Sequence, residues 1–263
     1  MEKQAEGARK AYEYGQENKI DWGRTASDYT RYRAGFPAEL FVRLERSFGV
    51  GLPDQRVLDI GTGTGTLAKR GCSVTGLDPS AEMMEGAKAL DEKEGVRVTY
   101  VQGKTEDTQL PTASFEVVTA GTCWHWFDSH KAFAEVARLL VEGGRLVICH
   151  FDWLPIKGSI AWRTEQLWNM NGGTGFYPQW TIDAAECGFT HIETFSFDVS
   201  VPYSHEAWRG RLRAMGGIAA ALTPDQVARF DRELDALLRE HAPDEPLFIP
   251  HRVWAMIATR PAK

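Results

Sequence analysis

The chain has 263 residues, of which 43% are hydrophobic and 25% are charged, and its formal net charge is −6 at pH 7. This composition is typical of a globular protein that is long enough to bury a hydrophobic core. No apolar run approaches the length of about 20 residues that crosses a bilayer, and the polar N-terminus lacks the apolar core of a signal peptide. We therefore expect a cytoplasmic protein that binds no membrane, and the acidic net charge disfavours nucleic acid as a partner.

The metal-ligating and thiol residues give no sign of a metal centre or of disulfides. His125 and His130 are five positions apart, but no third ligand follows nearby in the sequence, and zinc needs three or four. We therefore expect no metal. No Cys-x-x-Cys pair occurs, and buried free thiols in a reducing compartment are expected for the cysteines, which are Cys72, Cys123, Cys149 and Cys187.

In chain order, residues 1–18 are predicted to be a loosely held N-terminal tail, and residues 19–50 to form short helices. Strands then alternate with helices, and the strands are near-continuous apolar runs that end in glycine-rich or polar turns. Such runs are typical of a parallel sheet that helices cover on both faces, which makes an α/β fold the expected class. The strands of this part are predicted at 56–60, 73–77, 97–101, 115–120 and 145–150.

Beyond residue 150 the alternation is looser. Short helices are predicted around 159–170 and 180–187, a long strand at 191–201 and a final strand at 252–260. Residues 204–241 read as helical, and we interpret them as an insertion that caps the sheet rather than as an independent domain. The two strands that flank this insertion could still be neighbours in one sheet.

The first strand leads into a glycine-rich turn, GTGTGT, and the second strand ends in an acid. Gly61, Gly63 and Gly65 allow a ligand to approach the backbone closely, and the following helix offers free N–H groups. Asp78, at the end of the second strand, can accept hydrogen bonds from the hydroxyl groups of a ribose. The combination predicts binding of a nucleoside cofactor, and the alternative is a tight strand-to-helix turn beside an exposed carboxylate.

The spacing of the glycines separates two kinds of cofactor. A dinucleotide fingerprint has glycines at the first, third and sixth positions of the turn, whereas position six here is Thr66. VLDIGTGTGT instead resembles the first motif of class I S-adenosylmethionine-dependent methyltransferases. GLDPSAEMM, GKTEDTQLPTASFEVV and ARLLVEGGRLVI resemble later motifs of the small-molecule branch with a type 11 methyltransferase domain, in which the fourth strand often ends in a phrase like HWFD.

This resemblance implies a Rossmann-like class I methyltransferase fold over residues 51–263, with a seven-stranded, mostly parallel sheet and its last strand antiparallel beside the sixth. Residues 19–50 would be lid helices that close over the cofactor. The cofactor would be S-adenosyl-L-methionine. The resemblance assigns its contacts to Asp59, Gly61, Gly63, Gly65, Asp78, Pro79, Met83, Thr105, Glu106 and Tyr29.

The sequence departs from the family pattern at two places. Lys104 stands where relatives often carry an Asp that accepts from the adenine amine, and a lysine cannot accept a hydrogen bond. Only 16 residues separate Gly61 from Asp78, about one helical turn fewer than in relatives, so the helix after the glycine turn is expected to be short. Either the loop after it is very tight, or residues of the biological chain are missing here.

Two histidines follow the fourth and fifth strands, and ligands of open α/β sheets bind at that edge. Both are candidate catalytic residues, because histidine titrates near neutrality and is the commonest general base. We favour His150 as the base, since Asp152 and Trp153 follow it. For His125, within WHWF, a packing role competes with catalysis. Substrate contacts are expected from Trp124, Trp153, Tyr203 and Trp208, with core packing as the alternative.

Three arginines alternate along the inserted helical segment. Arg209, Arg211 and Arg213 cannot share one helical face, and most of them are expected to be solvated. One arginine turned inward would suit a substrate that carries a carboxylate. The sequence thus predicts an enzyme that methylates a small molecule, as a monomer or homodimer. The alternatives are a non-catalytic protein that binds the cofactor and, less favoured, a nicotinamide-dependent oxidoreductase.

Overall fold

The computed structural model describes residues 25–61, 66–168, 170 and 175–260. They divide into two compact units. The sheet unit comprises Gly35–Phe151, Phe176–Phe197 and the residues from Val253 onward. The helical unit comprises the residues up to Ala34, Asp152–Gly175 and Asp198–Arg252.

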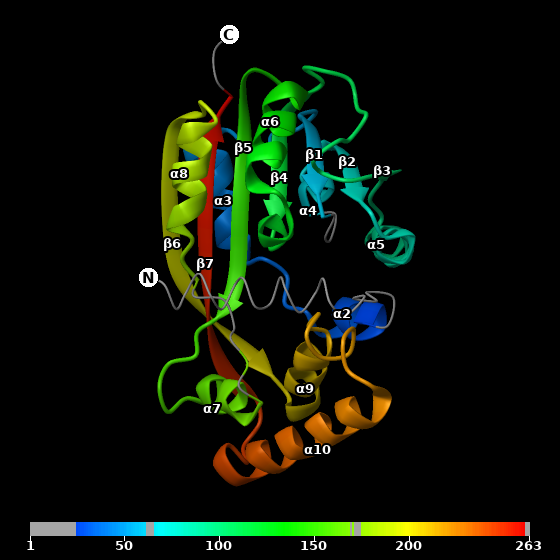
Figure 1. The fold of residues 1–263 in the computed structure, drawn as a ribbon, viewed down its shortest axis with the longest axis vertical. Coiled ribbons are helices and arrows are strands. Elements are labelled where there is room, and N and C mark those ends of the chain that lie inside the picture. The colour runs from blue at the N-terminus through cyan, green and yellow to red at the C-terminus, as the bar shows by residue number, and fades with distance from the viewer. Residues whose placement is uncertain (1–24, 62–65, 169, 171–174, 261–263) are drawn as a thin grey trace. The chain divides into compact units, whose positions relative to one another are not determined.

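The sheet has seven strands in the order β3-β2-β1-β4-β5-β7-β6, which confirms the predicted seven-stranded α/β architecture. Parallel pairing joins β1 to β2 and β4, β2 to β3, and β4 to β5. Figure 1 shows β7 running opposite to its neighbours β5 and β6, as the family resemblance implies. The strands are β1 Arg56–Ile60, β2 Ser73–Asp78, β3 Val98–Gln102, β4 Phe115–Gly121, β5 Leu140–Trp153, β6 Thr190–Tyr203 and β7 Leu247–Thr259.

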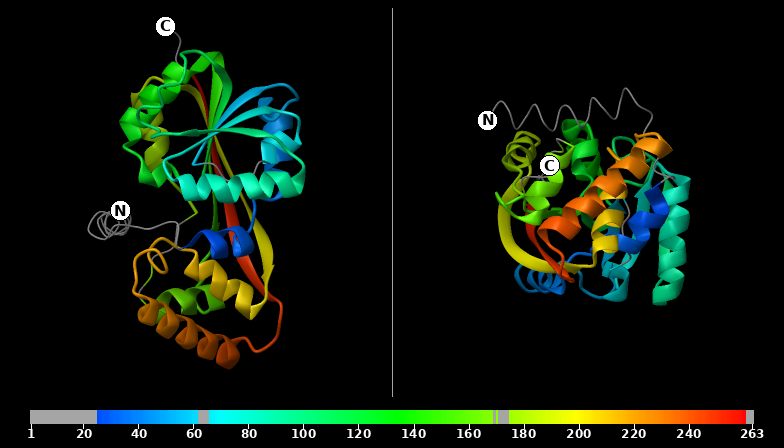
Figure 2. Two further views of the ribbon diagram at one scale, coloured as in Figure 1. Left: turned by 90° about the vertical axis from the view of Figure 1, so that its right-hand side faces the viewer. Right: turned by 90° about the horizontal axis from the view of Figure 1, so that it is seen from below.

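Helices cover both faces of the sheet unit: α6 and α8 pack on one face, and α3 lies on the other (Figures 1 and 2). The central strands bury side chains on both faces, so that Leu58, Val118 and Ile148 are fully buried. Phe133 of α6 joins the same core. The helical elements of this unit are α3 Ala38–Phe48, α4 Thr66–Lys69, α5 Ala81–Glu94, the 3-10 turn η2 Trp124–Trp126, α6 Ser129–Leu139 and α8 Pro178–Glu186.

The helical unit contains α2 (Ala26–Tyr32), α7 (Ile160–Leu167), α9 (His205–Arg213) and α10 (Pro224–His241). Its core is built around Trp208 of α9 and Phe230 of α10, both fully buried. Gly210 lets α2 approach α9, because a Cβ at this position would lie 2.1 Å from Cδ2 of the Tyr32 ring.

Some elements differ in length from the sequence-based prediction. β5 and β7 are longer than the predicted strands 145–150 and 252–260, and the helix expected at 159–170 spans only α7. The strands that flank residues 204–241 are indeed sheet neighbours. The segment 204–241 forms α9 and α10, which belong to one unit with α2 and α7. In the described part of the chain, no helix has the length and apolarity needed to span a membrane.

Candidate functional site

The turn after β1 has a glycine where no other residue fits. Gly61 has φ 66°, in the left-handed region, and its N–H donates to the Leu77 carbonyl at 2.8 Å. A Cβ here would lie 2.7 Å from Cβ of Cys123, which follows β4. The missing side chain therefore lets Cys123 pack against the backbone at the end of β1. Gly63 and Gly65 lie outside the described residues.

Asp59, at the end of β1, is held by the neighbouring strand. The hydroxyl of Thr119 in β4 donates a hydrogen bond to its Oδ1. The same carboxylate and, more strongly, burial raise the pKa of the Cys149 thiol, so this thiol stays protonated. All four cysteines are free, as predicted. The pairing of Asp59 with Thr119 could not be predicted from the sequence, because the partner lies 60 positions further along the chain.

Asp78 is the last residue of β2 and lies beside the glycine turn, since β1 pairs in parallel with β2. The backbone N–H of Ser80 donates to its Oδ1 at 2.9 Å. Burial raises the pKa of this carboxyl, and the Ser80 hydrogen bond only partly offsets the effect. No donor from the described residues reaches Oδ2, which leaves an acceptor for a ligand hydroxyl. The exposed Pro79 and the partly buried Met83, in the first turn of α5, adjoin this carboxylate in sequence.

The loop after β3 carries Thr105, which is 4% exposed, and Glu106. The Glu106 carboxylate accepts from the backbone N–H of Asp128 at 3.0 Å. The loop is anchored by Glu135 of α6, which accepts from the N–H and the hydroxyl of Thr108 at 3.0 and 2.6 Å. A hydrogen bond from Arg138 is the main reason that the pKa of Glu135 falls to about 2. Sequence reasoning missed this anchor, because a glutamate within a helix gives no sign of its buried partner.

The two candidate histidines lie together at the edge predicted for them, and their ring centroids are 5.5 Å apart. Their burial was not predicted: His150 is 2% exposed, whereas His125 in η2 is exposed. The His150 ring lies 4.2 Å from the ring of Tyr177 and 5.1 Å from that of Trp180, between centroids. These two aromatic residues, at the start of α8, were missed by sequence reasoning.

The residues expected to contact substrate are buried in the two cores. Trp124 is 1% exposed and packs on Phe133 in the sheet unit. In the helical unit, Trp153 and Trp208 form an edge-to-face pair with centroids 5.5 Å apart. Tyr203 packs on Trp208. These contacts account for the packing of all four residues, and their roles toward substrate stay predictions.

Tyr29, expected to contact the cofactor, belongs to the helical unit. Its hydroxyl accepts a hydrogen bond from Arg33, whose guanidinium also lies over the Tyr29 ring. Its role toward the cofactor also stays a prediction.

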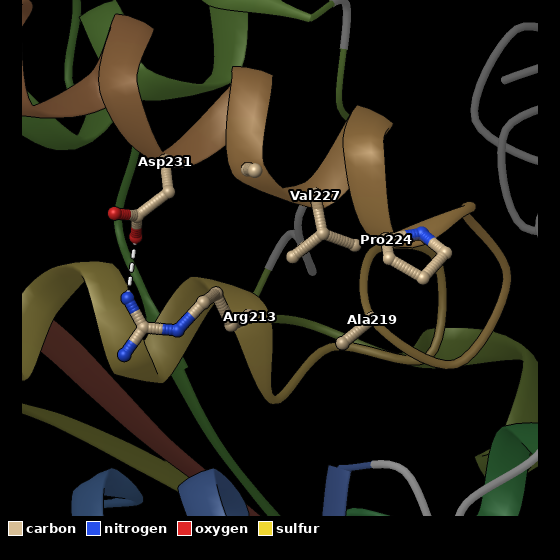
Figure 3. A pocket seen from close by; sticks show the side chains of 6 residues that line it. Arg213, Ala219, Pro224, Val227 and Asp231 are labelled. Atoms are coloured by element: carbon tan, nitrogen blue, oxygen red, sulfur yellow. Dashed lines mark hydrogen bonds and ion pairs between the residues drawn. The ribbon is translucent and has the colours of Figure 1, made fainter.

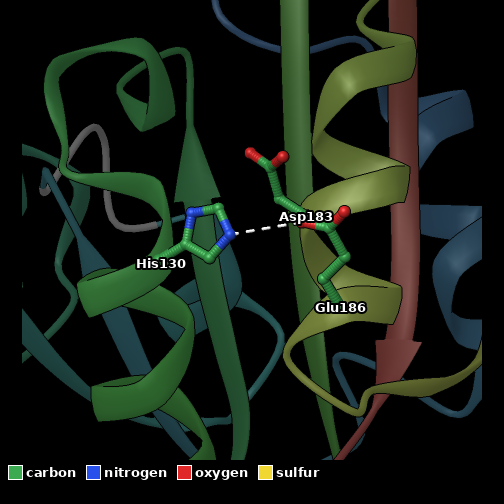
Figure 4. Close-up of side chains that lie close together, drawn as sticks. All are labelled: His130, Asp183 and Glu186. Atoms are coloured by element: carbon green, nitrogen blue, oxygen red, sulfur yellow. Dashed lines mark hydrogen bonds and ion pairs between the residues drawn. The ribbon is translucent and has the colours of Figure 1, made fainter.

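Two carboxylates from a distant part of the sequence lie beside His130. Ligand atoms of His130, Asp183 and Glu186 lie within 4.8 Å of one another (Figure 4). However, both oxygens of the buried Asp183 are engaged, since they accept from Ser129 at 2.6 Å and from Gln179 at 2.8 Å. His130 lies 3.3 Å from Glu186, and both are exposed. The group joins α6 to α8, and we assign it no metal.

The arrangement fits a nucleoside cofactor. Gly61 turns the chain tightly at the end of β1, and a half-buried carboxylate at the end of β2 keeps an oxygen available. Thr105 and Glu106 follow the adjacent strand β3, so the three elements expected to hold ribose and adenine lie on neighbouring strands. Among the described residues, Asp78 has no cationic partner, and the hydrogen bond that it accepts comes from the neutral backbone N–H of Ser80.

Residues 58–148 match the family model of a methyltransferase domain. An uncharacterized methyltransferase of Mycobacterium tuberculosis is 32% identical over 150 residues, which are 56% of this chain and 57% of the relative. The demethylmenaquinone methyltransferase of Thermus thermophilus is 34% identical over 114 residues, 41% of this chain and 51% of the relative. The chain thus spans little more than half the length of these curated relatives.

Solved structures share the fold. A putative type II methyltransferase from Anaeromyxobacter dehalogenans superposes with a TM-score of 0.57 at 21% identity, over 88% of this chain and 100% of that one. The phosphoethanolamine N-methyltransferase 2 of Haemonchus contortus, solved with phosphomonomethylethanolamine and S-adenosylhomocysteine, gives a TM-score of 0.54 at 21% identity, over 90% of this chain and 57% of that one.

Proposed function

We propose that this chain, whose residues 58–148 are a methyltransferase domain, transfers a methyl group from S-adenosylmethionine to a small-molecule acceptor. The observation that carries the proposal is the coincidence of this match with the site geometry. The matched segment contains both Gly61, pressed against Cys123, and Asp78, with one carboxylate oxygen available. The Haemonchus contortus enzyme, which shares the fold, was solved with S-adenosylhomocysteine.

S-adenosylmethionine, when bound, supplies an electrophilic methyl group on a sulfonium. The chain's own residues have to bind, orient and, where needed, deprotonate. Asp78 accepts hydrogen bonds from the ribose hydroxyls, and Gly61 lets the chain turn tightly between β1 and the cofactor. The loop that Glu135 anchors brings Thr105 and Glu106 toward the adenine. The acceptor must lie in line with the breaking carbon–sulfur bond, which makes positioning the main task of the protein.

The burial of the histidines changes which one we assign as base. An exposed imidazole can receive a proton from the acceptor and pass it to solvent, whereas His150 is closed in by Tyr177 and Trp180. We therefore assign proton removal to His125 and ring packing to His150. His125→Asn should lower turnover by about 10²–10⁴-fold with an unchanged melting temperature. His150→Asn should lower the melting temperature. The reverse pattern would restore His150 as the base.

Two ligands test the choice of cofactor. S-adenosylhomocysteine should raise the melting temperature by mass action, and NAD at the same concentration should not. A shift with NAD alone would favour the oxidoreductase. The four-residue helix α4 is the observation that favours a protein that binds the cofactor without turning it over. Formation of S-adenosylhomocysteine with a panel of hydroxy, amino and carbon acids as acceptors separates that alternative from an enzyme.

A further inference from the structure

Two arginines of α9 have acidic partners within the helical unit. Arg213 pairs with Asp231 of α10, beside a pocket that residues of the two helices and of their connection line (Figure 3). Arg213 also pairs with Asp28 at 2.8 Å, and Arg209 pairs with Asp231 at 3.4 Å. These charges neutralise one another, so we assign this pocket no ligand.

The sheet unit contains a threonine whose hydroxyl lacks such a partner. The hydroxyl oxygen of Thr122, just after β4, is buried, and no described residue forms a hydrogen bond with it. Leaving a buried hydroxyl without a partner is unfavourable, and buried polar groups are nearly always satisfied in proteins. Thr119, three residues earlier, shows the usual arrangement, since its hydroxyl donates to Asp59. Thr122 therefore lacks a partner that a bound ligand could supply.

The backbone of Thr122 lies in the left-handed region, with φ 59°. A β-branched side chain rarely adopts this conformation, and Thr122 is the one β-branched residue that does so in the part of the chain that the structure describes. Two contacts hold it there. Its N–H donates to the Cys149 carbonyl at 2.7 Å, and the thiol of the adjoining Cys123 donates to the Ile60 carbonyl at 3.1 Å. Strained residues that are held in this way cluster at ligand-binding sites.

Thr122 lies at the edge where open α/β sheets bind ligands. β1 and β4 are parallel neighbours; the chain continues from β1 to β2 on one side and from β4 to β5 on the other. Ligands bind outside the carboxyl ends of two such strands. Ile60 is paired with Ala120 in this register, so Gly61 and Thr122 follow the two strands at the same edge.

The order of the strands indicates which part of the cofactor would meet Thr122, and at this step the inference rests on the proposed function. Thr105 and Glu106, expected at the adenine, follow β3, and Asp78, expected at the ribose, ends β2. The next strands in the sheet are β1 and β4. A cofactor that has its adenine at β3 and its ribose at β2 continues toward these strands with its sulfonium and its amino-acid end.

We propose that the hydroxyl of Thr122 binds the amino-acid end of S-adenosylmethionine. A hydroxyl can donate to the carboxylate of this end or accept from its ammonium group, and hydrogen bonds to charged groups are stronger than those between neutral groups. Thr122 as a whole is partly exposed, and rotation about χ1 exchanges the positions of its hydroxyl and methyl groups. The hydroxyl can therefore reach a ligand without movement of the backbone.

The stability of the ligand-free protein tests whether the hydroxyl has a partner inside the chain. Thr122→Val keeps the β-branched shape and removes the hydroxyl, so the melting temperature should stay unchanged or rise. Thr119→Val is the matched comparison and should lower the melting temperature, because it removes the hydrogen bond to Asp59. An equal loss in the two variants would place the partner of Thr122 inside the chain and would overturn the inference.

Titration calorimetry on the full chain measures binding of S-adenosylhomocysteine and of 5′-methylthioadenosine, which lacks the amino-acid end. Thr122→Val should weaken binding of S-adenosylhomocysteine about tenfold or more, the effect of one hydrogen bond to a charged group, and leave binding of methylthioadenosine unchanged. Thr122→Ser keeps a hydroxyl and should retain the affinity of the wild type. Thr99→Val, which removes an exposed hydroxyl of β3, is the control.

The inference is overturned if Thr122→Val binds S-adenosylhomocysteine as tightly as Thr99→Val does, or if it weakens both ligands equally. A methyl-transfer assay on the wild type separates the inference from the proposed function. Binding that depends on Thr122, without turnover of any acceptor, would overturn the proposed function alone. A wild-type chain that binds neither ligand would overturn both.

Discussion

Asp78→Asn should make the ligand-free protein more stable and the cofactor complex weaker. The raised pKa of Asp78 shows that the folded state disfavours the charged carboxylate, chiefly because burial removes it from water. Above that pKa the wild-type chain bears this cost, and the neutral amide does not. The amide oxygen can still accept from the Ser80 N–H, which lies 2.9 Å from Oδ1 in the wild type. The melting temperature of the variant at pH 7 should therefore equal or exceed that of the wild type.

The same substitution removes the charged acceptor for the ribose hydroxyls. Hydrogen bonds to a charged group contribute about 1.5–3 kcal/mol, so the dissociation constant for S-adenosylhomocysteine should rise roughly 10- to 150-fold. For the wild type, affinity should also weaken as the pH falls toward the raised pKa of Asp78, and the variant should lack this dependence. Calorimetry at pH 5 and pH 8, with scanning of the free proteins, measures both effects. A stable variant with unaltered affinity would remove Asp78 from the cofactor site.

Three further substitutions test the packing. Gly61→Ala should cost about 1–3 kcal/mol in urea unfolding, because its Cβ would meet Cys123; unchanged stability would mean that the turn is not tight. For Glu135, the depressed pKa contributes stability that is present above pH 4.5 and lost as the pH falls toward 2, on the order of 2–3 kcal/mol. Glu135→Gln should flatten that acid dependence in urea titrations, and an equally steep curve would argue against the anchor. Gly210→Ala should destabilise the chain by a similar 1–3 kcal/mol, because the methyl would overlap the Tyr32 ring; an unchanged melting temperature would contradict the close helix contact.

The sheet could be predicted from the sequence because each strand is a compact apolar run closed by a turn. Gly61 and Asp78 were predictable for the same reason, since their places at the ends of β1 and β2 follow from the strands themselves. The parallel pairing of those strands then brings the two residues side by side. The local sequence pattern and the strand pairing therefore predict the same position for these two residues.

The burial of the two histidines could not be predicted in this way. WHWF reads as a packed segment, but η2 is a short 3-10 turn that buries Trp124 and leaves His125 exposed. His150 is enclosed by Tyr177 and Trp180, which come from the next helical region and whose approach no local pattern encodes. The burial of His150 therefore depends on the tertiary structure and not on its neighbours in the sequence.

Helical spacing separated Arg211 from its neighbours in α9 but did not identify their partners. The rotation of about 100° per residue predicts that Arg209 and Arg213 share a face and that Arg211 does not. Their expected solvation was wrong, because both are neutralised by acids of other helices. Arg211 instead contacts Trp153, which lies in a different segment of the chain.

The helical unit is assembled from segments that are far apart along the chain, and this sets the order in which it can fold. Tyr32 of α2 hydrogen-bonds Glu206 of α9, 174 positions later, and Arg213 pairs with Asp28, 185 positions earlier. Closing loops of this length is entropically unfavourable and slow. During synthesis α2 leaves the ribosome long before its partners exist, whereas β1, β2 and β4 can already pair. We therefore expect the part of the sheet formed by β1, β2 and β4 to form first, and α2 to dock among the last elements.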